Sequence, residues 1–371
     1  HGSFHTAAGL EHKIDSNGAF VPFPGSTVVF RLNKSCNQVV QLMQDALHEL
    51  LGSSNMLATR LNSASLHLTL HDLISPERFD TGQIYQTQVI DSATRAERVV
   101  EEIRREYAGQ KIIMTCDRIV NMVSKSLALM LKPATEQDYA LLQTWYAMFD
   151  DISPLPYPYT PHITLAYFRP GMLDGDHLAT IINELQVNQE NVPTFYFYPE
   201  ALTAQTFQDM QHYDDIPLRV CFCCDGGLNR SVMAACILNH LAKQKELAIT
   251  AEARAAFPNT QGRAISEQVW RMMEAQGIST DGVYRKARYL EDWESACFSC
   301  FAAISEGAAY RFSFMPLQRE QTAFFTTIYA GVKDPEYGEA SYETVFSDLY
   351  NRTVKMLDEY ENWSVRRWQR C

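Results

Sequence analysis

The chain has 371 residues, of which 46% are hydrophobic and 20% charged, and its formal net charge is −12. This length allows two domains, each with its own hydrophobic core. The composition is typical of a soluble globular protein and includes no apolar run long enough to cross a bilayer. The negative charge argues against non-specific binding to long nucleic acids, because it repels their phosphate backbone.

The nine cysteines are an odd number and lack the even spacing of a secreted disulfide framework. The first residues, His1-Gly2-Ser3, are typical of an affinity-tag remnant, and no secretory signal follows them. Cys297 and Cys300 are not accompanied by a second pair with zinc-like spacing. We therefore expect a cytoplasmic protein in a reducing compartment, without a bound metal, a cofactor or a membrane partner.

Two stretches of the N-terminal half match each other: SLHLTLHDL contains His67 and Thr69, and TPHITLAYF contains His162 and Thr164. Both alternate polar with apolar or β-branched residues and therefore predict strands. Side chains at i and i+2 share one face of a strand, so each strand presents an imidazole and a hydroxyl on the same side. His71 has the parity of His67, but we assign it no role.

Two such strands facing one cavity would place an imidazole on either side of a bound phosphodiester. One histidine would take a proton from water and the other would give a proton to the leaving oxygen, since the pKa of free histidine lies near neutral pH. The threonine hydroxyls would hold the non-bridging oxygens, and no metal is needed. The alternative interpretation is a pair of histidines buried in the core.

The paired His-x-Thr-hydrophobic stretches resemble the signature of the two-histidine (2H) phosphoesterase superfamily, which includes cyclic phosphodiesterases. The resemblance implies a bilobal α+β fold, with the two motifs on the central strands of opposite lobes. It also implies that His67, Thr69, His162 and Thr164 are catalytic. We expect this domain to span residues 4–205 and a second domain to span residues 216–371, with the boundary near the acidic end of VPTFYFYPEALTAQTFQDMQHYDD.

The stretch VCFCCDGGLNRSVMAACILNHL, residues 220–241, joins an apolar strand-like run to a helical pattern. A five-residue loop separates Cys224 from Arg230 at this junction. The N–H groups of such a loop and the N-terminus of the helix form an anion site, in which Arg230 adds a planar two-pronged donor. This environment favours the thiolate of Cys224, and Ser231 follows as a hydrogen-bond donor. The predicted phosphate-binding residues are Asp225, Gly226, Gly227, Leu228 and Asn229.

A proton donor for the leaving group is also predicted. Asp334 precedes Pro335 in a loop before an amphipathic helical stretch. We expect Asp334 to act as the general acid and later as the base that activates water. The alternative interpretation of the C-terminal half, a buried cysteine in a glycine-rich turn, explains neither the spacing nor the arginine.

Cys224, Arg230, Ser231 and Asp334 together resemble the low-molecular-weight protein tyrosine phosphatase family, over most of residues 218–360. The resemblance implies an α/β domain with a four-stranded parallel sheet flanked by helices. It also implies that the four residues are catalytic.

Three positions depart from the family pattern. Gly227 replaces an asparagine, and Asn229 replaces the second loop cysteine, which puts the family's disulfide switch in doubt. Cys223 neighbours Cys224 but is expected to face the opposite side of the strand. Glu336 replaces the aromatic residue that follows Asp-Pro, which favours a polar or sugar-bearing monoester over phosphotyrosine.

Together these patterns predict a bifunctional hydrolase of phosphoric esters. The two-histidine site would open a cyclic phosphate on a nucleotide, an RNA end or an ADP-ribose derivative, and Cys224 would then remove the resulting monoester phosphate. The first alternative is a protein tyrosine phosphatase whose N-terminal domain only binds a nucleotide or RNA. The second keeps both activities but on separate substrates. The expected partner is a small phosphorylated substrate or an RNA end, and the sequence does not indicate an oligomeric state.

Overall fold

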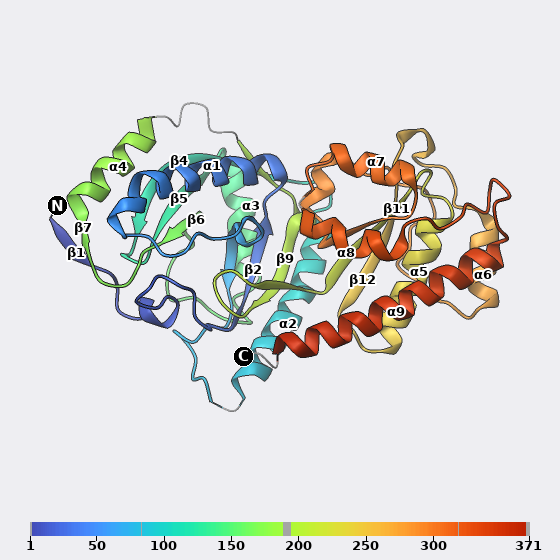
Figure 1. Cartoon of the computed structure of the whole chain (residues 1–371), viewed down its shortest axis with the longest axis horizontal. Coiled ribbons are helices and arrows are strands. Elements are labelled where there is room, and N and C mark those ends of the chain that lie inside the picture. Colours follow the sequence, from blue (N-terminus) through green and yellow to red (C-terminus); the bar gives the residue numbers. More distant parts are fainter. Residues whose placement is uncertain (1, 83, 188–193, 318, 369–371) are drawn as a thin grey trace. The chain divides into compact units, whose positions relative to one another are not determined.

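The computed structural model describes residues 2–82, 84–187, 194–317 and 319–368 (Figure 1). The chain divides into two compact units, residues 1–216 and 217–371. His1 of the expected tag remnant and the first two residues of the expected boundary segment lie outside the described residues. No described helix is both long and apolar enough to span a membrane.

The first unit is built on a curled antiparallel sheet, a half-barrel with eight strands in its described part. The strand order is β10-β9-β2-β3-β6-β5-β4-β8. The strands are β2 (Gly25–Arg31), β3 (His67–Asp72), β4 (Ile112–Met122), β5 (Ser126–Pro133), β6 (His162–Tyr167), β8 (Phe195–Phe197), β9 (Leu202–Phe207) and β10 (Tyr213–Ile216). The two strands that carry the histidine motifs, β3 and β6, were expected in opposite lobes. They are neighbours at the centre of one continuous sheet, with three further strands on the outer side of each.

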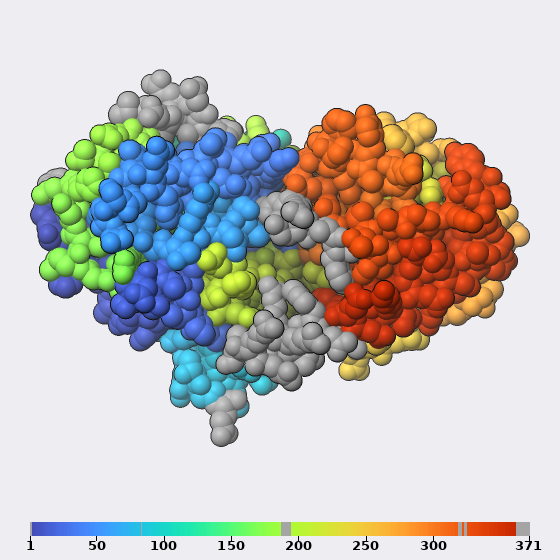
Figure 2. All heavy atoms as spheres, in the orientation of Figure 1, coloured from blue at the N-terminus to red at the C-terminus, as the bar shows by residue number. Residues whose placement is uncertain are grey.

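Four long helices pack on this sheet: α1 (Lys34–Leu51), α2 (Tyr85–Glu106), α3 (Glu136–Ala147) and α4 (Gly175–Val187). Side chains cap two of them, since Asn33 accepts a hydrogen bond at the start of α1 and Thr135 does so at the start of α3. Helices α1 and α4 lie side by side on the surface, in blue and green in Figure 2. A small ribbon of β1 (Ser3–His5) and β7 (Met172–Asp174) completes the unit.

The second unit has a parallel sheet in the order β12-β11-β13, formed by β11 (Leu218–Cys224), β12 (Ile249–Ala255) and β13 (Cys300–Ala303). Its helices are α5 (Arg230–Gln244), α6 (Glu267–Ala275), α7 (Glu306–Phe314), α8 (Arg319–Tyr329) and α9 (Tyr342–Trp368). The expected α/β fold is confirmed, but the described residues form three parallel strands where four were expected. Residues 330–341, between α8 and α9, run as turns and irregular chain, and the carbonyl of Val332 in this segment binds a side chain, Arg230.

Alternation along β11 divides the core of the second unit into two layers. Val220, Phe222 and Cys224 share one cluster with α5 and α9, whereas Cys221 and Cys223 belong to another, with residues of α7. Cys224, the last residue of β11 before the predicted anion-binding loop, therefore belongs to the layer formed with α5 and α9.

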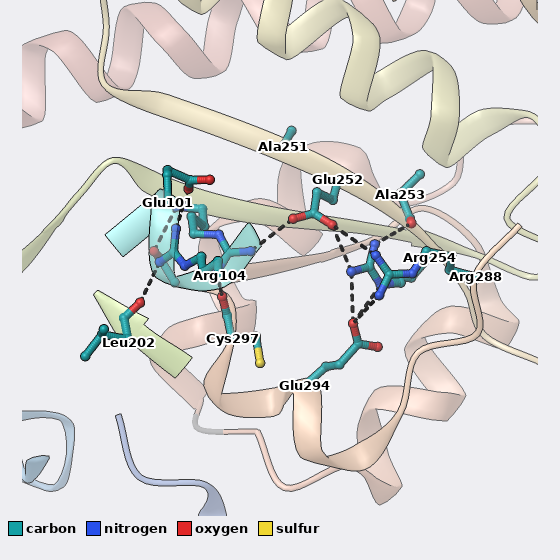
Figure 3. A network of polar contacts seen from close by, with 12 residues as sticks. Glu101, Arg104, Leu202, Ala251, Glu252, Ala253, Arg254, Arg288, Glu294 and Cys297 are labelled. Atoms are coloured by element: carbon teal, nitrogen blue, oxygen red, sulfur yellow. Dashed lines mark hydrogen bonds and ion pairs between the residues drawn. The ribbon is translucent and has the colours of Figure 1, made fainter. Parts of the chain in front are cut away.

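A buried ionic network stabilises the other side of this sheet (Figure 3). Arg254 binds Glu252 and Glu294, each at 2.9 Å, and Arg219 binds Glu252 at 3.0 Å. Burial raises the pKa of Glu252, but the two arginines outweigh it and hold this pKa at about 2. Because Glu252 and Arg254 pair in register with Cys221 and Cys223, the network fixes β12 against β11 behind the loop.

Candidate active sites

The four predicted residues of the N-terminal half lie around one cavity. Strands β3 and β6 run antiparallel, and Leu68 pairs with Ile163. Since each of these residues directly follows a motif histidine, each histidine lies beside the threonine of the other strand. The cavity has a volume of about 310 Å³. Its lining includes His67, Thr69, His162 and Thr164, all half-buried.

Each motif strand also has a β-bulge directly after its threonine. The register with the outer neighbouring strand shifts at Leu70 in β3 and at Leu165 in β6. Both leucines are buried, and so is the residue after each of them. The strands return to the cavity at Asp72 and Tyr167. The two halves of the sheet thus present the same local geometry to the cavity.

The bulge decides the position of His71. In an unbroken strand His71 would share the face of His67, but here its side chain is 1% exposed and lies in the core. Its ring centroid is 4.9 Å from that of Tyr146, and its Nδ1 is 2.8 Å from the Asp72 carbonyl oxygen. His71 is therefore a core residue on the far side of the strand from the cavity.

The two cavity histidines differ in their surroundings. His162 Nδ1 lies 2.8 Å from the Thr160 carbonyl oxygen, so Nδ1 is the protonated nitrogen and Nε2 is left for proton transfer. His67 packs edge-on against Tyr213, with ring centroids 4.9 Å apart. Burial lowers the pKa of His67 to about 4, although a hydrogen bond to the Ser65 backbone opposes this shift. His67 is therefore neutral at pH 7.

In the second unit, the predicted loop connects the end of β11 to the start of α5. The loop carbonyls turn outward, because Cys224 O accepts from Ala256 N at 2.9 Å and Asp225 O from Phe257 N at 3.3 Å. An anion bound at this loop would also meet the N-terminus of α5, which adds to the positive potential. The predicted residues Gly226, Leu228 and Asn229 all belong to this loop.

Glycine is required at position 227 for two reasons. Its φ of +62° lies in the left-handed region, which other residues adopt only with strain. A Cβ atom there would lie 2.8 Å from the backbone nitrogen of Ala255 on the neighbouring strand. The substitution of the family's asparagine by Gly227 therefore keeps the loop conformation and lets it approach β12 closely.

Cys224 and Ser231 face each other across the loop. Cys224 Sγ lies 3.2 Å from Ser231 Oγ, and both residues are buried. Cys223 belongs to the opposite core layer, as predicted. Asn229, at the position of the second loop cysteine, accepts a hydrogen bond from the Tyr342 hydroxyl at 3.0 Å, so this loop has no partner thiol for a disulfide.

Arg230 links the loop to the Asp-Pro segment. Its guanidinium donates to the Val332 carbonyl at 3.0 Å, to Asp225 Oδ2 at 3.1 Å and to Asp334 Oδ2 at 2.6 Å. Asp334 is 9% exposed and accepts from the backbone N–H of Glu336 at 3.0 Å. The predicted acid and the predicted anion-binding arginine therefore meet, although 104 positions separate them in the sequence.

The family model of the low molecular weight phosphotyrosine protein phosphatases matches residues 219–363. This region is a low-molecular-weight phosphotyrosine phosphatase domain. The match begins after the first unit, so the resemblance of the N-terminal half to the 2H superfamily stays a prediction. No curated protein matches the chain.

Three solved structures are each similar to part of the chain. YfkJ from Bacillus subtilis is 22% identical, covers 39% of this chain and 95% of its own, and has a TM-score of 0.32. The low molecular weight protein tyrosine phosphatase from T. tengcongensis is 22% identical, covers 38% and 99%, and has a TM-score of 0.34. A conserved protein of unknown function from Agrobacterium tumefaciens, ATU0111, is 19% identical, covers 57% and 92%, and has a TM-score of 0.43.

Some residues at both sites were not predicted from the sequence. Lys13, Lys125 and Tyr213 line the histidine cavity, and Tyr342 supports the loop of the phosphatase domain. Tertiary structure brings them there from distant segments, and no local motif marks them. Within the described ranges, no three or more His, Cys, Asp or Glu side chains are grouped so that they could hold a metal ion.

Proposed function

We propose that the phosphatase domain hydrolyses phosphomonoesters through a phosphocysteine intermediate on Cys224. The observation that carries this proposal is the convergence of three groups on one loop. Cys224 Sγ has a hydroxyl partner in Ser231 at 3.2 Å, and Arg230 contacts the carboxylate of Asp334 at 2.6 Å. A phosphoryl group bound at this loop would meet a nucleophile, a hydrogen-bond donor for its oxygens and a proton donor for the leaving group.

The reaction has two steps in this site. The phosphoryl oxygens bind the loop N–H groups and Arg230, displacing the carboxylates that hold the guanidinium. Cys224 Sγ attacks phosphorus, the bond to the leaving oxygen breaks, and Asp334 in its acid form gives that oxygen a proton. Asp334 then takes a proton from water, which attacks the phosphocysteine, releases phosphate and restores the thiolate.

The substrate class follows from the side chain beside the acid. Glu336 is exposed and follows Asp334-Pro335, where an aromatic ring would stack on a phosphotyrosine. A carboxylate offers no such stacking surface. We therefore favour a monoester with a polar or sugar-bearing leaving group.

A trapping experiment tests this proposal. With p-nitrophenyl phosphate, whose leaving group needs little proton donation, Asp334→Asn forms the intermediate but breaks it down slowly, because the base is gone. We expect mass spectrometry to find a phosphoryl group on the peptide that contains Cys224. Its absence from a variant that still consumes substrate would contradict the phosphocysteine mechanism.

We propose in addition that the first unit opens cyclic phosphates. What favours this function is the pair of matched, bulged strands that face His67, Thr69, His162 and Thr164 into one cavity. His67, neutral at pH 7, suits the role of general base toward water. His162 keeps its Nδ1–H on the Thr160 carbonyl, so its imidazolium form would give the Nε2 proton to the leaving oxygen. The hydroxyls of the threonines would hold the non-bridging oxygens.

Adenosine 2′,3′-cyclic phosphate tests this second function. We expect His67→Ala and His162→Ala each to reduce ring opening by at least about a hundredfold, as loss of a general acid or base does. His177→Ala on α4, outside the cavity lining, serves as the matched control and should have no effect. Tight nucleotide binding without turnover by the wild type would instead support the binding-module alternative.

The two activities would form one pathway, since ring opening produces a monoester and the phosphatase domain consumes one. Cytoplasmic location and a small phosphorylated substrate or RNA end fit this proposal. If the two sites act on unrelated substrates, variants of one site will leave the other reaction unchanged and no common intermediate will pass between them.

A further inference from the structure

The histidine cavity is cationic, although the chain as a whole carries a net charge of −12. Three cationic side chains line it, Lys13, Arg78 and Lys125, against two carboxylates, Asp72 and Glu77. Without counting the histidines, these five side chains leave one net positive charge in the cavity. An anionic ligand is therefore favoured here.

Two of these five charged side chains form hydrogen bonds with other groups of the protein. Arg78 donates to the Pro154 carbonyl at 3.0 Å, and Asp72 accepts from the Tyr157 hydroxyl at 3.1 Å. The other three form a cluster, in which Glu77 Oε1 lies 3.0 Å from Lys125 Nζ and 3.4 Å from Lys13 Nζ. Two ammonium groups thus share one carboxylate.

The cluster is shielded from solvent. The side chains of Lys13 and Lys125 are 14% and 26% exposed, and Lys13 Nζ lies 4.7 Å from the centroid of the Phe23 ring. Burial lowers the pKa of Lys13, and Glu77 only partly offsets this. Burial also raises the pKa of Glu77, but the two lysines outweigh it and hold this pKa below its usual value. One more anion would complete the charge balance of the cluster.

The backbone that positions Lys125 is strained. The hairpin between β4 and β5 turns at Val123 and Ser124, with φ of 45° and 57°, and Lys125 N donates to Met122 O at 3.0 Å. Such turns normally use Asn-Gly, and a positive φ is a true outlier for a β-branched residue. Strain of this kind collects at ligand sites. The turn delivers Val123, Lys125 and Ser126 to the cavity lining.

Building on the proposed cyclic phosphodiesterase function, we propose that Lys13 and Lys125 bind a second anionic group of the substrate. The cyclic phosphate lies between the histidines, and a phosphate monoester or pyrophosphate elsewhere on the same molecule lies against the lysines. A cavity of about 310 Å³ is at the lower end of ligand-pocket volumes, roughly 300–1,000 Å³, which suits a substrate of mononucleotide size. The substrate class is a cyclic phosphate that carries a further phosphate group.

A pair of substrates that differ in one phosphate tests this proposal. Wild-type kcat/KM is measured for adenosine 2′,3′-cyclic phosphate and for the same compound with a 5′-phosphate. We expect a preference for the 5′-phosphorylated form of about ten- to a hundredfold, the size of one or two charge-assisted contacts. ADP-ribose cyclic phosphate forms a third arm, which distinguishes a pyrophosphate from a monoester as the preferred anion.

Lys13→Met and Lys125→Met should each reduce this preference by about tenfold, because each variant removes one ammonium group from the proposed anion site. Lys125→Arg should retain the preference because it retains the charge. Lys132→Met is the matched control, since Lys132 is 63% exposed and pairs with Asp117 outside the cavity lining. Equal kcat/KM for all the substrates, or a preference that survives both methionine variants, would overturn the proposal.

Binding without turnover separates this inference from the catalytic proposal. Calorimetry compares adenosine 2′-phosphate with adenosine 2′,5′-bisphosphate on the wild type and on the lysine variants. Tighter binding of the bisphosphate that the methionine variants lose supports the second anion site, even if the wild type opens no ring. Equal affinities overturn the second anion site, whether or not rings are opened.

Discussion

Arg230 Nη2 lies 2.6 Å from Asp334 Oδ2, so the arginine proposed to bind the phosphoryl group is paired with the proposed general acid. Asp225 contacts the same guanidinium nitrogen at 3.1 Å. A phosphoryl group must therefore replace carboxylate partners when it binds Arg230. We therefore expect substrate binding to include an exchange of carboxylate oxygens for phosphoryl oxygens at this guanidinium.

We expect Asp225 to be more dispensable than Asp334, which is the proposed general acid. The other carboxylate oxygen of Asp225 accepts from Ser305 Oγ at 2.8 Å, a bond that the amide oxygen of asparagine can also accept. We expect Asp225→Asn to lower the inhibition constants of phosphate and vanadate about three- to tenfold, because one competing charge is removed. Inhibition assays with p-nitrophenyl phosphate measure this. Weaker vanadate binding in the variant would show that Asp225 assists the anion.

Adjacent cysteines provide a matched test of the nucleophile. Cys224→Ser should reduce p-nitrophenyl phosphate hydrolysis by more than about a thousandfold, as the loss of a covalent nucleophile does. Cys223→Ala should keep nearly full activity, because Cys223 faces the opposite core layer. The kcat values of the two variants show whether Cys224 alone is the nucleophile. Similar losses of kcat in both variants would point to a structural role for the two cysteines.

Gly227→Ala should destabilise the phosphatase domain and abolish vanadate binding. The left-handed φ alone costs about 1–2 kcal/mol with a Cβ atom, and the contact with Ala255 N at 2.8 Å adds to this cost. Gly262→Ala is the control, since its φ is +78° but a Cβ atom there would meet nothing within 4 Å. Hydrogen exchange over β11 and β12 compares the two variants, and equal protection in both would refute the close-approach argument.

The pH dependence of ring opening tests the role of His67. Burial holds its pKa at about 4, below the ordinary 6.5, so the neutral base persists as the pH falls from 6.5 toward 4. We expect kcat/KM for adenosine 2′,3′-cyclic phosphate to fall on the acid side with a midpoint near 4. If kcat/KM instead falls on the acid side with a midpoint near 6.5, the base is an exposed imidazole and not His67.

The sequence was most informative where the functional residues are covalent neighbours. Cys224 to Ser231 form one loop, and its strand-to-helix position could be predicted from spacing and periodicity. His67 and Thr69 could be placed on one face because they share a strand. The bulge that turns His71 into the core has no sequence signal, since a leucine occupies position 70 as it would in an unbroken strand.

Residues that meet through tertiary structure could not be predicted from local patterns. Lys13 and Lys125 come from separate segments of the chain, and only the folded structure brings both beside Glu77. The expected fourth parallel strand came from family resemblance. In this chain, residues 330–341 run as turns and irregular chain, and Val332 supplies a carbonyl to Arg230.

We propose that one chain carries two phosphoesterase centres that act in sequence. A phosphorus NMR time course with adenosine 2′,3′-cyclic phosphate tests it in the wild type, in Cys224→Ser and in His67→Ala/His162→Ala. We expect a transient monoester and then free phosphate in the wild type, an accumulated monoester in Cys224→Ser, and an intact ring in the double variant. A wild type that leaves the ring closed, or that opens it and never releases phosphate, would contradict the claim.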